Sequence, residues 1–179
     1  YQPDSRAQSL RSGDSRTIGL LIPDIHNPHY WQVVEGVEEQ AYEQDYDVLL
    51  VVSYLDQRRE DRCLQALSRR TISGLLVMRT FSFKSETVER LRASGRPVIE
   101  IGSPGPLFGF DRVHADYSQG MKDLLAHLLG LGHERFAFIN GVAEPALGKD
   151  RLEVYHQTLK EGGVARQQAL VINCGSTTE

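Results

Sequence analysis

Short apolar runs alternate along this chain with segments whose apolar residues recur at helical spacing. The runs show no polar alternation, which is typical of strands covered on both faces in a parallel sheet. Seven runs predict strands, at residues 18–22, 47–52, 74–78, 97–101, 112–115, 135–140 and 169–173. Because helical segments separate these runs, the order predicts an α/β fold with a doubly wound parallel sheet and right-handed crossovers.

The segment from residue 17 to residue 41 shows this pattern most clearly. Pro23 ends an apolar run, Asn27 is a suitable N-cap, and Pro28 stands at the first helical position, where its missing N–H costs nothing. One face of the predicted helix carries Tyr30, Val33, Val34, Val37 and Ala41. The loop at 24–30 therefore follows the carboxyl end of a parallel strand, where open α/β sheets bind their ligands.

Further helices are predicted between the later strands. Asp56 begins one, Ser85 begins another, and Gly95 ends the second. A long helix has apolar residues on one side and ends at Gly132; these residues are Met121, Leu124, Leu125 and Leu128. The last helix follows a loop at 141–149 and runs through Leu152, Tyr155 and Leu159. Residues 102–110 have the composition of a loop.

Composition narrows the class of protein. Apolar residues make up 40% of the 179 residues and charged residues 25%, as in an ordinary folded domain. The net charge of −4 argues against nucleic-acid binding by the body of the chain. Cys63 and Cys174 lack the spacing of a zinc site or a disulfide framework. The chain has no apolar run of membrane length and its start is too polar for a signal peptide, so we expect a cytoplasmic protein without membrane contact.

Sequence signatures of catalysis are missing. The chain has no G-x-S-x-G elbow, no G-x-x-x-x-G-K-S/T phosphate loop and no H-E-x-x-H pair. Its six histidines show no metal-ligand spacing. We therefore expect a protein that is not an enzyme and that uses no metal and no cofactor.

Four separate pieces of the chain, in the right order and spacing, resemble the LacI/GalR family of transcription regulators. One looks like the hinge helix after a DNA-reading headpiece, one like the opening strand and effector loop, one like the crossover between two lobes, and one like the R-x-x-G-(aromatic) helix of the second lobe. These pieces are residues 1–13, 17–30, 127–141 and 151–155.

This resemblance implies a type I periplasmic-binding-protein-like fold whose two lobes close on a small effector, usually a sugar or related metabolite. It implies a hinge or linker at 1–13, a first lobe at 14–131 and the start of a truncated second lobe at 132–179. It also implies a homodimer and operator DNA as a partner, bound through a headpiece that would precede Tyr1.

A sugar pocket needs aromatic faces and polar groups that bind vicinal hydroxyls. The resemblance places effector contacts at Asp24, His26, Asn27, His29, Tyr30, Asp116, Arg151 and Tyr155. Four of them have a structural alternative. Tyr30 also fits the buried helical stripe, Asp116 would cap the following helix, and Arg151 would form a surface salt bridge. Tyr155, one turn after Arg151, is better explained by core packing.

Three hinge residues carry a DNA-binding prediction. In the family, a hinge leucine wedges into the minor groove at the centre of the operator while nearby arginines meet phosphates. Leu10 would supply the wedge here, with Arg6 and Arg11 as the phosphate contacts. Asp4 stands in place of the usual asparagine and weakens the match, because a carboxylate is unfavourable near phosphates.

We therefore interpret the chain as the effector-sensing and dimerisation core of a LacI-type regulator, a repressor that responds to a sugar-like metabolite. The alternative is a periplasmic sugar-binding protein that serves a transporter, which would share the fold but would have no hinge before its first strand. An enzyme on the same scaffold would need a nucleophile or phosphate loop that this sequence lacks.

Overall fold

The computed structural model describes residues 15–102, 108–140 and 145–174, with only the backbone at 145–150. Contacts divide the chain into two compact units. Within the described residues, unit 1 contains 15–102 and 108–113, and unit 2 contains 114–140 and 145–174. The predicted hinge at 1–13, with Arg6, Leu10 and Arg11, lies outside the described residues.

Unit 1 contains a parallel five-stranded sheet in the order β2-β1-β3-β4-β5. Its strands are β1 (Thr17–Ile22), β2 (Asp47–Val52), β3 (Gly74–Met78), β4 (Val98–Ile101) and β5 (Asp111–Val113). In the register of the sheet, Leu20 of β1 pairs with Leu50 on one side and with Leu76 on the other. The strand order therefore reverses at β1, which makes the carboxyl end of β1 a topological switch point.

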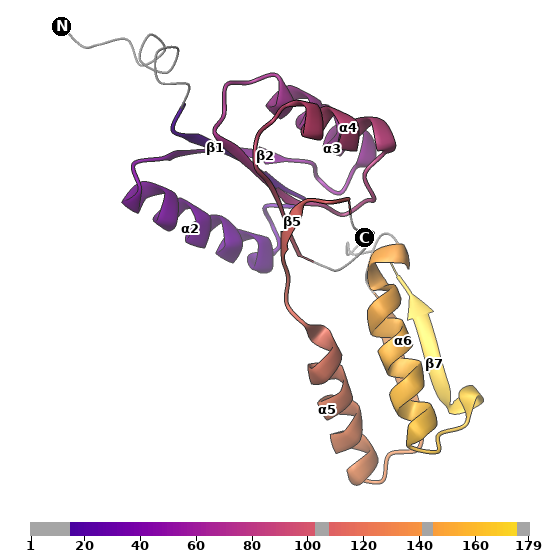
Figure 1. Cartoon of the computed structure of the whole chain (residues 1–179). Helices are drawn as coiled ribbons and strands as arrows, with labels where there is room; N and C mark the ends of the chain where they lie inside the picture. Colours follow the sequence, from indigo (N-terminus) through magenta and orange to yellow (C-terminus); the bar gives the residue numbers. More distant parts are fainter. Residues whose placement is uncertain (1–14, 103–107, 141–144, 175–179) are drawn as a thin grey trace, which may run out of the picture. The chain divides into compact units, whose positions relative to one another are not determined.

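Helices cover both faces of this sheet. Figure 1 shows α2 (Pro28–Glu43) on one face and both α3 (Gln57–Ser68) and α4 (Ser85–Ala93) on the other. Leu20 and Ile22 pack with Val34 of α2, whereas Leu21 packs with Leu64 of α3. These three residues of β1 have no exposed surface. The prediction of a strand covered on both faces is confirmed.

The N-terminal caps of α2 and α3 agree with the sequence pattern. The Asn27 side chain accepts a hydrogen bond from the His29 backbone N–H at 3.0 Å, and Asp56 accepts one from Arg59 at 2.7 Å. Each cap satisfies a backbone donor that the first turn of a helix would otherwise leave unpaired. These bonds fix where α2 and α3 start, and hence the shape of the loops that precede them.

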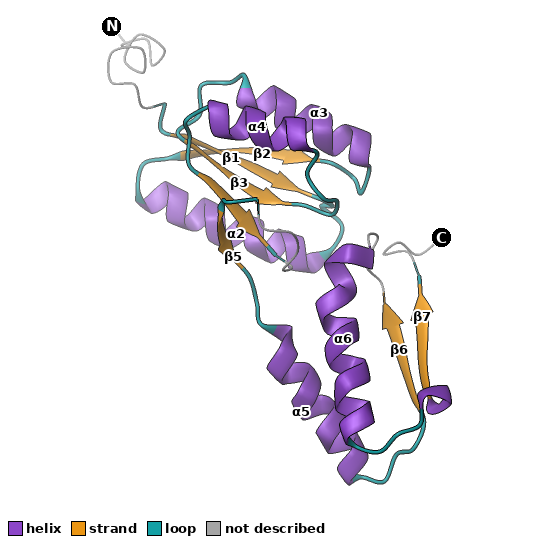
Figure 2. Cartoon of the chain, turned by 45° about the vertical axis from the view of Figure 1, so that its right-hand side comes forward, coloured by secondary structure: helices purple, strands orange, loops and turns teal. Residues whose placement is uncertain are grey.

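Unit 2 is built from two helices on one side of a two-stranded parallel sheet (Figure 2). Its elements are α5 (Tyr117–Gly130), β6 (Phe136–Asn140), α6 (Pro145–Glu161), the 3₁₀ helix η1 (Arg166–Gln168) and β7 (Ala169–Asn173). Leu125, Phe136, Tyr155 and Leu159 form its buried core. Of the residues on the opposite face of the strands, Ile139, Leu170 and Ile172 are exposed.

Three details differ from the sequence-based expectations. The fifth strand ends at Val113 rather than residue 115, because its last pair with β4 is Ile101 with Val113. The last helix begins at Pro145, inside the predicted loop; Pro is favourable in a first turn, but Gly148 weakens the helical signal there. Leu124 was expected on the buried side of its helix and is 53% exposed.

The division into units also differs from the predicted lobe boundary between residues 131 and 132. The contacts place α5 with unit 2. Leu125 of α5 is buried against Phe136 and Tyr155, which explains the difference. A helix that connects two lobes can be assigned to either one by sequence pattern, and only its packing shows which core it joins.

Candidate functional site

Five of the predicted effector residues lie at the carboxyl end of β1 and in the first turn of α2. Asp24 accepts a hydrogen bond from the His26 backbone N–H at 2.9 Å. Asn27 accepts one from His29 as the cap of α2. The Asp24 and Asn27 side chains thus brace the loop itself, which leaves the exposed rings of His26 and His29 as its outward groups.

Tyr30 combines the two roles that the sequence left open. It is half-buried and packs against the apolar cluster that contains Leu20 and Val34. Its ring centroid lies 5.5 Å from that of His29, with the planes tilted by 54°. The buried-stripe alternative is therefore confirmed for part of its surface, and the rest joins His29 in an aromatic pair at the edge of the sheet.

The loop after β2 adds an aromatic residue that sequence reasoning missed. Tyr54 is 45% exposed, and the Arg59 guanidinium carbon lies 4.7 Å from the centre of its ring. Backbone hydrogen bonds from Ser53 to Ile22 and from Leu55 to Pro23, both 3.0 Å, hold this loop beside the loop after β1. Tyr54 was detectable as the second residue after a predicted strand.

The backbone of this second loop is strained. Tyr54 and Leu55 have φ angles of 53° and 57°, the left-handed region that side chains with a Cβ seldom occupy. Each such residue costs on the order of 1 kcal/mol or more and is often found at a functional site.

A buried charged cluster lies across the next three strands. Arg79, directly after β3, donates a hydrogen bond from Nε to Glu100 Oε2 of β4 at 2.8 Å, and Arg112 Nη2 of β5 lies 3.4 Å from the same oxygen. The side chains of Arg79 and Glu100 are each 4% exposed. Arg79 also lies 5.1 Å from the ring centres of Phe83 and Phe108. We refer to Arg79, Glu100 and Arg112 as the charged cluster.

Glu60 of α3 is a second buried carboxyl near this edge. It is 3% exposed and accepts a hydrogen bond from the Thr80 backbone N–H at 3.2 Å. Desolvation by burial raises the pKa of Glu60 to about 7, against the lowering effects of that hydrogen bond and of Arg79. The Glu60 carboxyl therefore ties α3 to the loop after β3 and changes charge near neutral pH.

Sequence reasoning missed these buried charges for a definite reason. Arg58, Arg59, Glu60, Asp61 and Arg62 form a charge run, which usually marks a solvated helical face. Only the packing of α3 on the sheet shows that Glu60 points inward. Glu100 gave a weak signal, as a lone carboxyl within an apolar strand.

In unit 2, Asp116 precedes the first residue of α5 and Arg151 lies in the second turn of α6. Asp116 caps α5 by accepting a hydrogen bond from the Ser118 backbone N–H at 2.8 Å, and this bond lowers the pKa of Asp116. The capping alternative is confirmed. The Arg151 guanidinium carbon of α6 lies 4.3 Å from the ring centre of Tyr117, the first residue of α5. Packing of α5 on α6 thus brings Arg151 close to a residue 34 positions earlier.

Tyr155 belongs to the core of unit 2. It is 2% exposed, stacks on Phe138 at 5.3 Å, and donates its hydroxyl to the Leu170 carbonyl at 3.1 Å. The core-packing interpretation is confirmed. Its alternative as an effector contact does not fit this burial, because both its ring and its hydroxyl are already used within unit 2.

The described residues contain neither a metal-binding cluster nor a membrane-spanning helix. No group of three or more His, Cys, Asp or Glu side chains at 15–102, 108–140 or 145–174 is placed to hold a metal ion. No helix in that part of the chain is long and apolar enough to cross a membrane. The carboxyl edge of β1 and β2 in unit 1 carries the aromatic rings and hydrogen-bonding groups described above. These are the groups that a sugar-like ligand requires.

Curated relatives of this chain are transcription regulators. The HTH-type transcriptional regulator DegA of Bacillus subtilis is 27% identical over 174 residues, 96% of this chain and 52% of DegA. The ribose operon repressor of Escherichia coli is 30% identical over 165 residues, 92% of this chain and 50% of the repressor. The chain thus spans about half the length of these relatives.

Solved structures show the same fold. A LacI family regulator from Enterococcus faecium with bound ribose matches with a TM-score of 0.74 at 26% identity, over 89% of this chain and 57% of that one. The Cra dual regulator of Pseudomonas putida, in complex with fructose 1-phosphate, matches with a TM-score of 0.80 at 23% identity, over 90% of this chain and 58% of that one. The predicted type I periplasmic-binding-protein-like fold is confirmed.

A match to a whole family is more informative than any one of these pairs. Residues 15–179 match the family described as periplasmic binding proteins and sugar binding domain of LacI family. The match contains the effector loop, the crossover and the helix of Arg151, three of the pieces on which the resemblance rested. This chain therefore belongs to the family of periplasmic binding proteins and LacI-type sugar-binding domains.

Proposed function

We propose that this chain is the effector-sensing and dimerisation core of a LacI-type DNA-binding transcription regulator, a repressor that responds to a sugar or a related small metabolite. The carboxyl edge of β1 and β2 carries this proposal, since its exposed aromatic rings suit a sugar ring and the fold is one that binds sugars. The relatives described above are regulators, which supports this function over that of a transporter's binding protein.

The effector contacts proposed in unit 1 are the loop after β1 and Tyr54. His29 and Tyr30 offer tilted rings, Tyr54 an exposed one, and His26 a polar group. A sugar stacks its C–H face on such rings while its hydroxyls bond to the polar groups. Asp24 and Asn27 would affect effector binding indirectly, because their hydrogen bonds hold the loop after β1 in its conformation.

In unit 2, Arg151 is the proposed effector contact. Its guanidinium can form paired hydrogen bonds with two oxygen atoms of one ligand. Stacking on Tyr117 restrains the guanidinium and so reduces the conformational entropy that binding would cost. Asp116 supports this corner by capping α5.

Regulation would follow from a difference in effector affinity between two states of the protein. An effector that binds one state more tightly shifts the population towards it, and the hinge reports that shift to the operator. Leu10, with Arg6 and Arg11, is the proposed DNA-contacting part of the hinge, in a homodimer. A regulator of this kind acts in the cytoplasm.

A thermal-shift screen against sugars, sugar phosphates and nucleobases tests the proposal, because a ligand that binds only the native state raises its melting temperature. The expected result is a sugar hit that weakens at least tenfold in Tyr54→Ala and in Arg151→Ala by calorimetry. Tyr42→Ala is the matched control, since Tyr42 of α2 is 79% exposed and makes no part of the proposed site.

Two outcomes would contradict the assignment. Equal weakening by all three variants would show a loss of folding rather than of contacts. Sugar binding unchanged by Tyr54→Ala and Arg151→Ala would place the effector elsewhere. The regulatory half of the proposal is established if the full-length protein binds its operator and the same sugar releases it from the DNA.

A further inference from the structure

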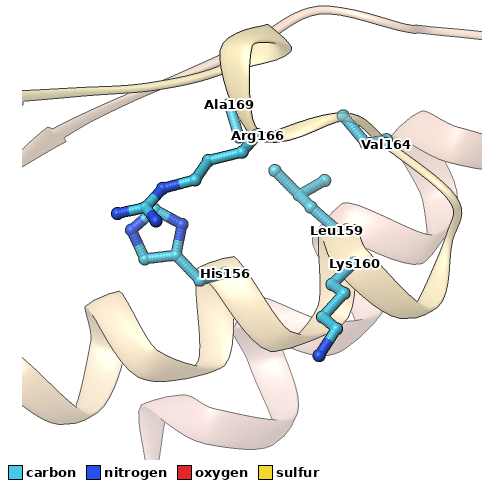
Figure 3. A pocket seen from close by; sticks show the side chains of 6 residues that line it. All are labelled: His156, Leu159, Lys160, Val164, Arg166 and Ala169. Atoms are coloured by element: carbon cyan, nitrogen blue, oxygen red, sulfur yellow. The ribbon is translucent and has the colours of Figure 1, made fainter.

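A pocket lies in unit 2 between the last turns of α6, η1 and the start of β7 (Figure 3). Its volume is about 500 Å³, within the range in which proteins bind small molecules. The residues that line it are His156, Leu159, Lys160, Val164, Arg166 and Ala169. Ala169 is the first residue of β7, so the pocket lies at the amino end of this strand, opposite to the end where α/β folds bind their usual ligands.

Three of the six lining residues are His156, Lys160 and Arg166, and none is a carboxylate. In Figure 3 the Arg166 side chain extends from η1 towards His156, whereas Lys160, on the next turn of α6, points away from these two side chains. No ion pair within the described part of the chain includes any of the three. Lys160 and Arg166 are cations, and a bound anion would supply a counter-charge for both.

The rest of the pocket is apolar. Leu159 is 1% exposed and belongs to the buried core of unit 2. Val164 and Ala169 are partly buried and pack against the same core. The pocket therefore has a rigid apolar floor and a basic rim, an arrangement that suits a ligand with both an apolar body and a charged group.

The end of a helix explains only one of these three side chains. The carboxyl end of α6 carries partial negative charge, which favours a cation such as Lys160 in the last turn. Arg166 belongs to a different element, and His156 lies one turn further back along α6. Stabilisation of the helix end therefore does not account for the presence of Arg166 and His156 in the lining of this pocket.

We propose that this pocket binds a small organic oxyanion. Arg166 holds its phosphate or carboxylate group through the paired donors of the guanidinium, with His156 and Lys160 as additional donors. The apolar body of the ligand packs on Leu159, Val164 and Ala169. This site is separate from the proposed effector contact of unit 2, because Arg151 does not line the pocket. Arg151 precedes His156 by five positions and Lys160 by nine positions along α6, roughly 7 Å and 13 Å along the helix axis.

Phenyl phosphate is the probe, with three comparison compounds that each remove one feature. Phenol lacks the anion, inorganic phosphate lacks the apolar body, and benzoate replaces phosphate by carboxylate. Titration is followed by nitrogen-15 NMR of the protein at constant ionic strength. We expect the amides of residues 156–169 to shift, and phenyl phosphate to bind at least tenfold more tightly than phenol or inorganic phosphate. Tighter binding of benzoate would support the site and identify carboxylates as its ligands.

Variants locate the site. Arg166→Gln should weaken phenyl phosphate binding about tenfold and Lys160→Gln about threefold, since the first loses a bidentate contact and the second a single one. Lys122→Gln, which removes an exposed cation from α5 outside the pocket, should leave binding unchanged. All three sites are exposed, and the spectra of the free variants report whether they fold.

Three results would overturn the proposal. The first is that phenol binds as tightly as phenyl phosphate. The second is that Arg166→Gln binds phenyl phosphate as tightly as the unchanged protein does. The third is that the amide shifts caused by phenyl phosphate are confined to residues 24–30 and 116–118. A failure here leaves the proposed function intact, because sugar binding is expected to be unchanged in Arg166→Gln. If Tyr54→Ala loses sugar binding but binds phenyl phosphate normally, the proposed sugar site can be removed without affecting the oxyanion site.

Discussion

β1 and β6 each open a strand–helix–strand motif, but their surroundings differ. Leu20, Leu21 and Ile22 are fully buried, because α2 covers one face of β1 and α3 covers the other. Along β6, Phe136 is buried whereas Ile139 is 66% exposed. The described part of unit 2 supplies helices on one face of its strands, with α5 and α6 both joined to the cluster of Phe136.

The comparison shows that an apolar run in the sequence does not by itself mean that both faces of the strand are buried. The segments at 18–22 and 136–139 are similarly apolar. Burial follows from the number of layers that pack on the sheet, and a run without alternation indicates that both faces can be covered. In unit 1 the cover is present on both faces, and in unit 2 the described residues provide it on one.

The largest difference in the free energy of unfolding is expected between truncation of an apolar side chain in β1 and truncation of one in β6. Leu21→Ala removes a side chain with no exposed surface and should lower the free energy of unfolding by about 4 kcal/mol. Ile139→Ala removes one from the exposed face of β6 and should change it by less than about 0.5 kcal/mol. Denaturant unfolding measured by far-UV circular dichroism checks both. Equal costs would show that Ile139 is buried in the protein in solution.

Unit 1 also buries charge, and removal of one partner tests how that charge is balanced. Arg79→Met should lower the free energy of unfolding by about 3 kcal/mol, because Glu100 stays buried with Arg112 as its remaining partner. The triple variant Arg79→Met, Glu100→Met and Arg112→Met replaces every charge of the cluster by an apolar side chain and should recover most of this loss. Unfolding followed by the fluorescence of Trp31, the single tryptophan, reports on unit 1. A triple variant less stable than Arg79→Met would contradict the explanation.

Glu60 predicts a pH dependence that belongs to unit 1. Its pKa is raised by desolvation from 4.5 to about 7 in the folded protein. Between these values the unfolded chain has released the proton and the folded chain retains it, so stability is full below pH 4.5 and falls as pH rises to about 7. The loss should be on the order of 3 kcal/mol, because one pKa unit corresponds to about 1.4 kcal/mol. Glu60→Gln should remove this slope; a slope unchanged in the variant would assign it to another group.

A smaller loss of stability than for Arg79→Met or Glu60 is expected from the loss of one hydrogen bond in unit 2. Tyr155→Phe keeps the stacking on Phe138 and removes the hydroxyl that donates to the Leu170 carbonyl. The cost should be about 1 kcal/mol, the usual value for one neutral hydrogen bond. Faster hydrogen exchange of the amides in β6 and β7, with those of β1 and β2 unchanged, would show that the two units open separately. Faster exchange in β1 as well would contradict that separation.

Local sequence patterns predicted most of the fold. Asn27 and Asp56 were expected at helix starts and both cap a helix, because a cap depends only on residues within one turn. The run at 169–173 was expected as a strand and forms β7. The end of β5 was misplaced because it depends on the length of β4, which lies elsewhere in the sequence.

The candidate site was less predictable. The loop after β1 was located from the sequence, since a ligand loop follows its strand directly. Tyr54 was missed because its place beside that loop depends on the pairing of β1 with β2. Arg151 was selected by resemblance, but its contact with Tyr117 depends on how α6 packs on α5.

The sequence by itself determined the α/β class, the order of elements, the caps and the family, because these follow from periodicity and from motifs within short segments. Only the tertiary structure decided that Glu60 is buried, that Arg79 and Arg112 share Glu100, and that His156, Lys160 and Arg166 line one pocket. The physical reason is that burial and electrostatic partners are set by residues far apart in the chain, through packing that no local pattern encodes.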